Sequence, residues 1–205
     1  MNADPGIKRG RKFDAVLRGA RTVFLRDGFE GASVDDIARA AQVSKATLYN
    51  YFPDKRLLFL EVARTEIASV TDHAMEVIDR TKPPASVLKA AAHTIIGFNI
   101  SAMGLAIYRL CVAEAERFPE LGRAFYDAGA VTGRAAIIEY FNEAMARGEL
   151  VIHDTRLAAD QFFELCRADL QLRLLLGVSE VAEPVEVERI AQGAVDMFLA
   201  RYATA

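Results

Sequence analysis

The sequence predicts an all-α protein with an N-terminal three-helix domain and a larger helical bundle after it. Apolar residues recur at helical spacing along nearly all of the 205 residues, and no run alternates as a half-buried strand does. Glycine and proline separate these helical runs. Hydrophobic residues make up 52% of the chain, which is enough to fill a substantial core. We expect residues 1–55 to form an N-terminal arm and the first domain, and residues 56–205 to form the second.

The first two helices are indicated by apolar spacing and by the residues at their ends. Apolar residues follow the i, i+3, i+4 pattern over residues 11–27, and Gly28 provides a natural stop. A second helix is expected to begin at Val34. Ser33 precedes it as a cap, and Asp36 takes the place of the more common glutamate of a capping box.

The third helix is short, and its two sides differ. Ser44 is the expected cap, Pro53 ends the run, and Asp54 caps a long fourth helix over residues 54–79. A turn of 100° per residue places apolar side chains on the side that faces the first two helices, namely Leu48, Tyr51 and Phe52, joined by Val43. The opposite side carries small and hydrogen-bonding groups and no carboxylate: Lys45, Ala46, Thr47, Tyr49 and Asn50.

The rest of the chain is predicted to form further helices of the larger domain. Their expected ranges are residues 84–101, 105–118, 119–147, 155–176 and 184–202. The predicted breaks lie at Gly104, at Phe118 and Pro119, at Gly148, and over residues 177–183.

Charge is unevenly distributed along the chain. The whole sequence has 25 basic and 28 acidic residues, a net charge of −3. Up to Arg56 there are eleven Lys or Arg and seven Asp or Glu, whereas the remainder has fourteen and twenty-one. A basic segment ahead of an acidic body is expected where one end of a protein meets a polyanion.

The short third helix has the properties of a helix that reads DNA. An α-helix fits the major groove of B-form DNA, and a projecting helix supported by two others is the helix-turn-helix arrangement. Thr47 and Asn50 have groups suited to base edges, and Lys45 reaches either a guanine or a phosphate. The alternative is a small helical bundle whose polar face is only solvated.

Several nearby side chains are candidates for phosphate contacts. Tyr49 and Tyr51 offer phenolic hydroxyls, although Tyr51 lies beside the core face and has a structural alternative. Ser33 and Lys55 stand at the starts of helices, where free backbone N–H groups favour an anion. A basic arm adds attraction that does not depend on sequence: Lys8, Arg9, Arg11 and Lys12.

Residues 13–62 resemble the N-terminal domain of the TetR/AcrR family of transcriptional regulators. The resemblance rests on the Gly28-Phe29 step, on "SVDDIARAAQVSKATLYNYF" and on "DKRLLF" at the start of the fourth helix. It implies a homodimer that binds a double-stranded DNA operator of two-fold symmetry, usually as a repressor. It also implies a C-terminal domain that binds a small-molecule effector. The family's DNA-contact positions are occupied by Thr47, Tyr49, Asn50, Tyr51 and Lys55, with a tyrosine at 51 where histidine is more usual.

Residues 108–129, "YRLCVAEAERFPELGRAFYDAG", resemble a C-terminal subfamily called AefR-like. The last two predicted helices carry apolar stripes broad enough for association through a four-helix interface. The alternative is that both helices only close the core of the monomer. The expected interface residues are Leu157, Leu165, Leu172, Ala191, Val195, Phe198 and Tyr202.

The effector is expected to be small and mostly apolar, because pockets are generally apolar with a few polar anchors. Polar residues in otherwise apolar helices and aromatic residues near them are the candidates, although such residues are also common in an ordinary core. The expected set is His93, Phe98, Asn99, Met103, Tyr108, Phe125, Phe141, Phe162 and Asp169.

Other classes of function have weaker support in the sequence. Residues 90–108 carry no membrane anchor by our interpretation, because their polar side chains and glycines suit a helix buried in protein. No cofactor or metal is expected, since the acid–histidine pairs near His73 and at His153 bring no further partner. We expect a cytoplasmic protein that is not an enzyme. A helical adaptor without DNA affinity remains an alternative.

A redox-responsive regulator of the same fold is a further alternative. Cys111 and Cys166 are too far apart in sequence to indicate a disulfide framework or a metal spacing. Both lie in apolar helical surroundings, where thiols are usually inert packing residues.

Overall fold

The computed structural model describes residues 10–204, and the regular elements within that range are all helical. The predicted all-α fold is therefore confirmed. Lys8 and Arg9 of the predicted basic arm lie outside the described residues. The elements are α1 (Arg11–Gly31), α2 (Val34–Ala40), α3 (Lys45–Tyr51), α4 (Lys55–Val77), α5 (Pro84–Ile100), α6 (Ala102–Ala113), α7 (Pro119–Tyr126), the π-helical turn η1 (Asp127–Val131), α8 (Thr132–Ala146), α9 (Thr155–Arg167), α10 (Leu170–Leu175) and α11 (Pro184–Tyr202).

Contacts divide the chain into two compact units, and the division differs from the one predicted after residue 55. The first unit holds the residues up to Glu66 together with Ala106–Phe125. The second holds Ile67–Leu105 together with the residues from Tyr126 onward. The first three turns of α4 and most of α6 and α7 therefore belong with the N-terminal helices.

Aromatic packing explains why the start of α4 belongs to the first unit. The Phe59 ring lies edge-on to Phe24, with ring centroids 4.9 Å apart, and edge-on to Phe29 at 5.2 Å. The guanidinium of Arg56 lies 3.5 Å from the centroid of the Phe118 ring, in the segment between α6 and α7. These contacts join α4 both to α1 and to the α6–α7 segment of the same unit.

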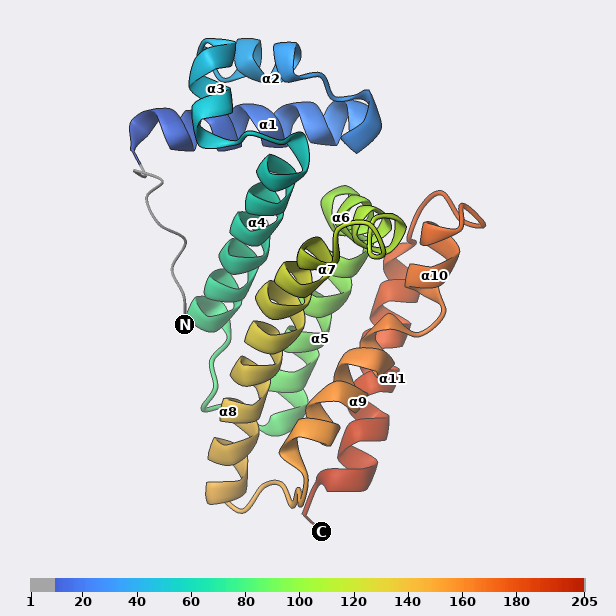
Figure 1. The fold of residues 1–205 in the computed structure, drawn as a ribbon. Coiled ribbons are helices and arrows are strands. Elements are labelled where there is room, and N and C mark those ends of the chain that lie inside the picture. The colour runs from blue at the N-terminus through green and yellow to red at the C-terminus, as the bar shows by residue number, and fades with distance from the viewer. Residues whose placement is uncertain (1–9, 205) are drawn as a thin grey trace. The chain divides into compact units, whose positions relative to one another are not determined.

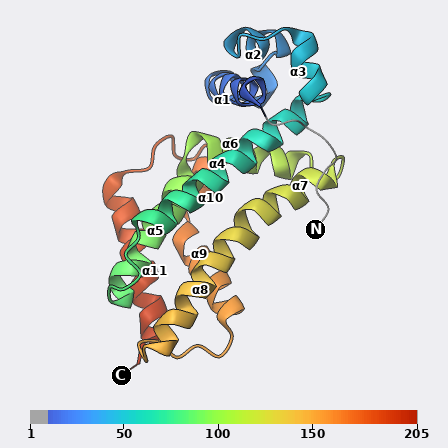
Figure 2. The ribbon, with the colours of Figure 1, turned by 90° about the vertical axis from the view of Figure 1, so that its left-hand side faces the viewer.

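Helices α2 and α3 pack across one side of α1, as Figures 1 and 2 show. Helix α1 buries an apolar stripe that includes Val16 and Ala20, and Leu48 and Phe52 are buried opposite it. The Phe13 ring stacks on Phe52 with centroids 5.4 Å apart. The side of α3 predicted to face the other helices is thus the buried one.

The first helix does not stop at Gly28 but bends there. Gly28 has φ 71° and ψ 178°, and a further helical turn reaches Gly31. A positive φ of this kind favours glycine, which explains why the chain has one at the bend. The end of the helix predicted at Gly28 is therefore wrong, because the chain bends there and continues for another turn.

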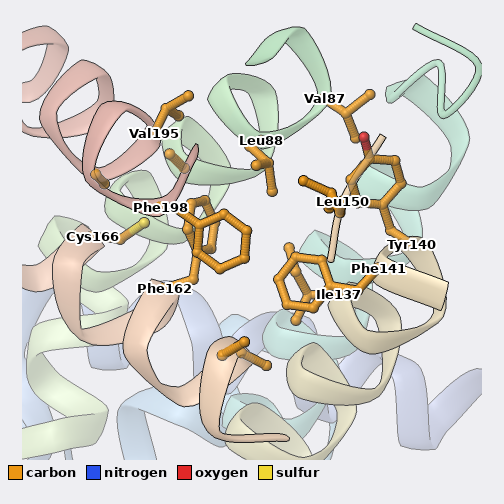
Figure 3. Close-up of a cluster of buried hydrophobic side chains, with 14 of the residues drawn as sticks. Val87, Leu88, Ile137, Tyr140, Phe141, Leu150, Phe162, Cys166, Val195 and Phe198 are labelled. Atoms are coloured by element: carbon orange, nitrogen blue, oxygen red, sulfur yellow. The ribbon is translucent and has the colours of Figure 1, made fainter. Parts of the chain in front are cut away.

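Helices α5, α8, α9 and α11 surround the core of the second unit. Figure 3 shows the cluster of buried side chains that they contribute. Phe198 of α11 is central to this cluster, since its ring stacks on Phe141 at 5.0 Å and lies edge-on to Phe162 at 5.3 Å. All three rings are almost completely buried.

Three predicted helix boundaries are corrected. The expected helix 155–176 is interrupted at Ala168, whose φ is 40°, and at Asp169. The expected helix 119–147 contains the π-helical turn η1. The break expected at Gly104 lies at Ser101 instead, and Gly104 lies in the first turn of α6, where a Cβ atom would fall 2.1 Å from the Phe98 carbonyl oxygen.

Within residues 10–204, no single helix is both long and apolar enough to cross a membrane. Helices α5 and α6 pass that test only as a pair, which is bent by 63° at the break between them. Several apolar residues of the stretch 90–108 are buried in the protein: Ala92, Ile96, Met103, Leu105 and Ile107.

A prediction for stability follows from the close packing of α1 on the turn after α2. A Cβ atom on Gly19 would lie 2.6 Å from the backbone nitrogen of Ala41, so Gly19→Ala should force the helices apart. We expect the clash to cost about 1–3 kcal/mol, more than the gain of up to about 1 kcal/mol in helix propensity. The net result, measured by urea unfolding, should be a loss of stability.

Gly97→Ala in α5 is the matched control, because Gly97 is exposed and a Cβ atom there would meet nothing within 4 Å. Here we expect a gain of about 0.5–1 kcal/mol. Equal gains for the two variants would contradict the close approach of α1 to Ala41.

Candidate nucleic-acid interface

A tight turn connects α2 to α3. Gln42 adopts a left-handed conformation with φ 54°, and the backbone N–H of Val43 donates to the Ala38 carbonyl at 3.0 Å. No glycine marks this position, so the left-handed turn is not predictable from residue type. The turn delivers Ser44 to the start of α3, where its hydroxyl accepts from the Thr47 N–H at 3.1 Å. The predicted cap is confirmed.

The outward side of α3 is exposed as the helical spacing predicted. Lys45, Ala46, Tyr49 and Asn50 are all exposed, and Tyr49 keeps 49% of its surface accessible. Thr47 is half-buried, and its hydroxyl lies 2.9 Å from that of Ser44. The face therefore presents an amide, a phenol and an ammonium group without an apolar cover.

Tyr51 has a different environment from Tyr49. It is half-buried, and its ring lies edge-on to Phe13 with centroids 5.7 Å apart. Tyr51 therefore packs against α1, as its structural alternative predicted. A contact between Tyr51 and phosphate stays a prediction.

Lys45 has an acidic partner that sequence spacing did not indicate. Its ammonium lies 2.5 Å from a carboxylate oxygen of Asp35 on α2, and both side chains are about half exposed. An exposed ion pair of this type contributes only about 0–1 kcal/mol. The pair is weak enough for Lys45 to exchange Asp35 for a phosphate or a base.

Ser33 is already occupied by the capping interaction at the start of α2. Its hydroxyl accepts from the Asp36 N–H at 3.0 Å and donates to the Asp36 carboxylate at 2.6 Å. The hydroxyl, followed by Arg39, holds the pKa of Asp36 below its usual value. The predicted cap is confirmed, and a phosphate contact by Ser33 stays a prediction.

Lys55 is directed toward main-chain carbonyls at the end of α1. Its ammonium donates to the Phe29 oxygen at 2.8 Å and to the Ala32 oxygen at 3.1 Å, with the Glu30 oxygen at 3.5 Å. Asp54 caps α4, the helix that begins at Lys55, because its carboxylate accepts from the Arg56 N–H at 2.8 Å. The Arg56 side chain also donates to this carboxylate and holds its pKa below the usual range.

The expected effector residues have several different environments. Phe141 and Phe162 are fully buried parts of the packed core of the second unit, and Met103 is also buried. Phe98 and Asn99 are half-buried on α5. These positions fit the core alternative at least as well as a ligand contact.

Two polar members of the expected effector set are corrected. His93 is not an interior anchor, since its imidazole lies on the surface 3.0 Å from Glu188, which also pairs with Lys89. Asp169 lies between α9 and α10 rather than inside a helix, with its side chain 73% exposed and paired with Arg173 at 2.7 Å. Neither residue is a buried polar group in need of a ligand.

Tyr108 and Phe125 belong to the first unit, where their rings lie edge-on with centroids 6.5 Å apart. They thus form an aromatic contact between α6 and α7. Sequence reasoning had grouped them with residues that the structure assigns to the other unit.

The predicted dimer residues also divide into two groups. Ala191, Val195 and Phe198 face the core of their own protomer, so their assignment to an exposed interface was wrong. Leu165 and Tyr202 are half-buried, whereas Leu157 and Leu172 are half exposed. Other exposed apolar residues of the second unit include Leu176, Val178, Val181, Val185 and Met197.

The other candidate sites were a metal site, the acid–histidine pair at His153 and the two cysteines. No three His, Cys, Asp or Glu side chains there are grouped to hold a metal ion. Asp154 caps α9 by accepting from the Leu157 N–H at 2.9 Å. Both cysteines are free and buried, and burial raises the pKa of Cys111 to about 11 and that of Cys166 to about 12.

Comparisons with known proteins agree with the helix-turn-helix geometry. Residues 16–62 match the family model described as bacterial regulatory proteins of the tetR family. Residues 86–204 match the model described as the C-terminal domain of AefR-like transcriptional repressors. A curated relative, the HTH-type transcriptional repressor AcnR of Corynebacterium efficiens, is 33% identical over 76 residues, which are 37% of this chain and 40% of that protein. The chain thus matches well under half the length of this relative.

Solved structures extend the similarity over nearly the whole chain. A structure from Mesorhizobium loti described as a TetR-family transcriptional regulator has a TM-score of 0.86 and 29% identity, covering 97% of this chain and 100% of its own. The flavonoid-responsive regulator FrrA has a TM-score of 0.73 and 34% identity, covering 95% of this chain and 98% of its own. The family of these proteins is one of regulators and not of enzymes. The C-terminal family model alone spans more than half of the sequence, and with the helix-turn-helix match it shows that the chain belongs to the TetR family of DNA-binding transcriptional regulators.

Proposed function

We propose that this TetR-family regulator is a repressor that binds a palindromic operator as a homodimer and leaves it when a small, mostly apolar effector binds. The observation that carries the proposal is the exposed outer face of α3, which is supported by α1 and α2 and presents Lys45, Tyr49 and Asn50. The match to AefR-like repressors supports repression as the direction of control.

The roles on DNA follow from the side-chain chemistry of this face. Asn50 has an amide that suits the paired donor and acceptor of an adenine edge, and Thr47 has a hydroxyl and a methyl group next to it. Ala46 is small enough to let the helix approach the base edges. Tyr49 and Lys45 are suited to the flanking phosphates, where contacts position the protein without reading sequence.

The proposed dimer uses the outer sides of α9 and α11. These helices pack together in the second unit, and the Tyr202 hydroxyl donates to the Gln161 side chain at 2.9 Å on their exposed side. Leu157 and Met197 expose 50% and 64% of their surfaces on these helices. Two-fold association would bury them and present two copies of α3 to grooves about 34 Å apart, one turn of DNA.

The proposed effector response rests on the connection of α6 to the DNA-binding helices. Helix α6 begins in the second unit, and from Ala106 it is part of the first. There, Arg56 at the start of α4 lies over Phe118 and pairs with Asp54. An effector that favours one position of α6 shifts the population of DNA-binding states by its differential affinity for them. FrrA is flavonoid-responsive, which supports a small aromatic ligand.

Asn50→Ala tests base reading by α3. With an operator chosen by selection from random duplexes, we expect a loss of about 1–3 kcal/mol in operator affinity, and little change on a scrambled duplex. Fluorescence anisotropy at fixed salt measures both affinities. Asn142→Ala, which removes an exposed asparagine of α8, is the matched control and should bind as the unchanged protein does. Equal losses on the two duplexes would contradict a base contact.

The dimer interface is tested by placing charge on the exposed sides of α9 and α11. The double variant Leu157→Glu, Met197→Glu should dissociate to monomers, because two-fold symmetry brings the new carboxylates together without partners. Sedimentation velocity measures the mass, and circular dichroism checks that helicity is kept. Val112→Glu, the same kind of change at a residue of α6 that is 61% exposed, should leave the mass unchanged. A dimeric double variant would reject this interface.

The redox alternative is tested by thiol reactivity. Burial keeps Cys111 and Cys166 protonated, so neither should react with iodoacetamide at pH 8 until urea unfolds the protein. The folded state holds these protons more tightly than the unfolded chain, whose thiols titrate near about 8.5. The free energy of unfolding should therefore decrease as pH rises above about 8.5. Rapid labelling of either thiol in the native protein would favour redox sensing instead.

A further inference from the structure

The ammonium of Lys55 is fully used within the protein. A lysine ammonium has three N–H donors and no acceptor. Three main-chain oxygens surround this one, those of Phe29 at 2.8 Å, Ala32 at 3.1 Å and Glu30 at 3.5 Å. The same ammonium lies 4.5 Å from the centroid of the Phe29 ring, within range for a cation–π contact. Its donors are thus directed into the first unit.

The three acceptors lie in the segment that follows the bend at Gly28. The last carbonyls of a helix have no partner within it, and a cation at that end is favoured by the helix dipole. In this unit the cation comes from the first residue of α4, 23 positions beyond Ala32. Lys55 therefore acts as a cap for α1 supplied by another helix.

This cap is placed where it fixes the start of the helix-turn-helix. Ala32 is followed directly by Ser33, which caps α2, and α2 leads through a short turn to α3. The Phe29 ring also packs edge-on against Phe59, so α4 holds the segment at two points, one turn of helix apart. Movement of this segment would be passed to α2 and α3 through two residues of chain.

We propose that Lys55 is a positioning residue for DNA binding, which holds the start of α2 against α4, and that it makes no direct phosphate contact. The inference uses the DNA-binding role of the family and revises the phosphate contact expected for Lys55 from the resemblance. The ammonium is the only donor group of the Lys55 side chain. To contact a phosphate, it would have to give up hydrogen bonds to these main-chain carbonyls. Lys45 provides the comparison, since its ammonium is about half exposed and has one weak surface partner.

The test measures Lys55→Met for thermal stability and for the salt dependence of DNA binding. The slope of log K against log salt is negative, and a lost phosphate contact lowers its magnitude by about 0.9 per contact. We expect no change in this slope for Lys55→Met but a lower thermal midpoint. We also expect affinity for a selected operator to fall relative to a scrambled duplex, by about tenfold for each base contact misaligned. Binding is measured well below the thermal midpoint of each variant.

Lys45→Met is the matched control and should show the opposite pattern, a smaller slope with an unchanged thermal midpoint. Lys55→Arg keeps the charge, but its N–H groups lie in one plane and fit three converging carbonyls less well than a compact ammonium does. It should lose operator discrimination under our proposal and bind normally if Lys55 held a phosphate. It also carries the test should Lys55→Met fail to fold.

Two results would overturn the proposal. A reduced salt slope in Lys55→Met with an unchanged thermal midpoint would restore the phosphate contact. A reduced midpoint with operator and scrambled affinities both unchanged would show that Lys55 contributes to stability alone and positions nothing for DNA.

Discussion

The packing of α2 and α3 on α1 is the constraint on which the DNA-binding unit depends. Each of the two helices has seven residues, and isolated helices shorter than about 12–15 residues are marginal in water. Their stability must come from contacts such as the approach of Gly19 to Ala41 and the stacking of Phe13 on Phe52. Because the packing residues of α3 lie on one side of the helix, the residues on the other side are not needed for packing. Tyr49 and Asn50 on that side are exposed.

Short-range signals predicted most of the fold because they act within a few residues of chain. Ser33, Ser44 and Asp54 cap the helices they were expected to cap, since a cap needs only its own helix. The break at Ala168 was missed because neither glycine nor proline marks it. The bend at Gly28 was misjudged because a glycine signals positive φ without saying whether another turn follows.

The functional face was predictable in outline, and the partners of its charged groups were not. Helical spacing alone places Lys45 and Asn50 outward. It does not show that Lys45 meets Asp35, or that Lys55 meets Phe29 and Ala32, because those pairs join different elements. A charged residue at a family contact position can therefore either bind DNA or stabilise the protein. Its neighbours in the structure show which of these two roles it has.

The same reasoning limits how two protomers can associate. The apolar stripe of α11 is broad enough in sequence to suggest an interface. In the structure, however, Ala191, Val195 and Phe198 are buried in the core of their own protomer. An interface on this helix must use its remaining side, where Met197 stands among exposed polar residues such as Gln192 and Asp196. Such a surface offers fewer apolar contacts than the stripe suggested, so the proposed interface also depends on the exposed Leu157 of α9.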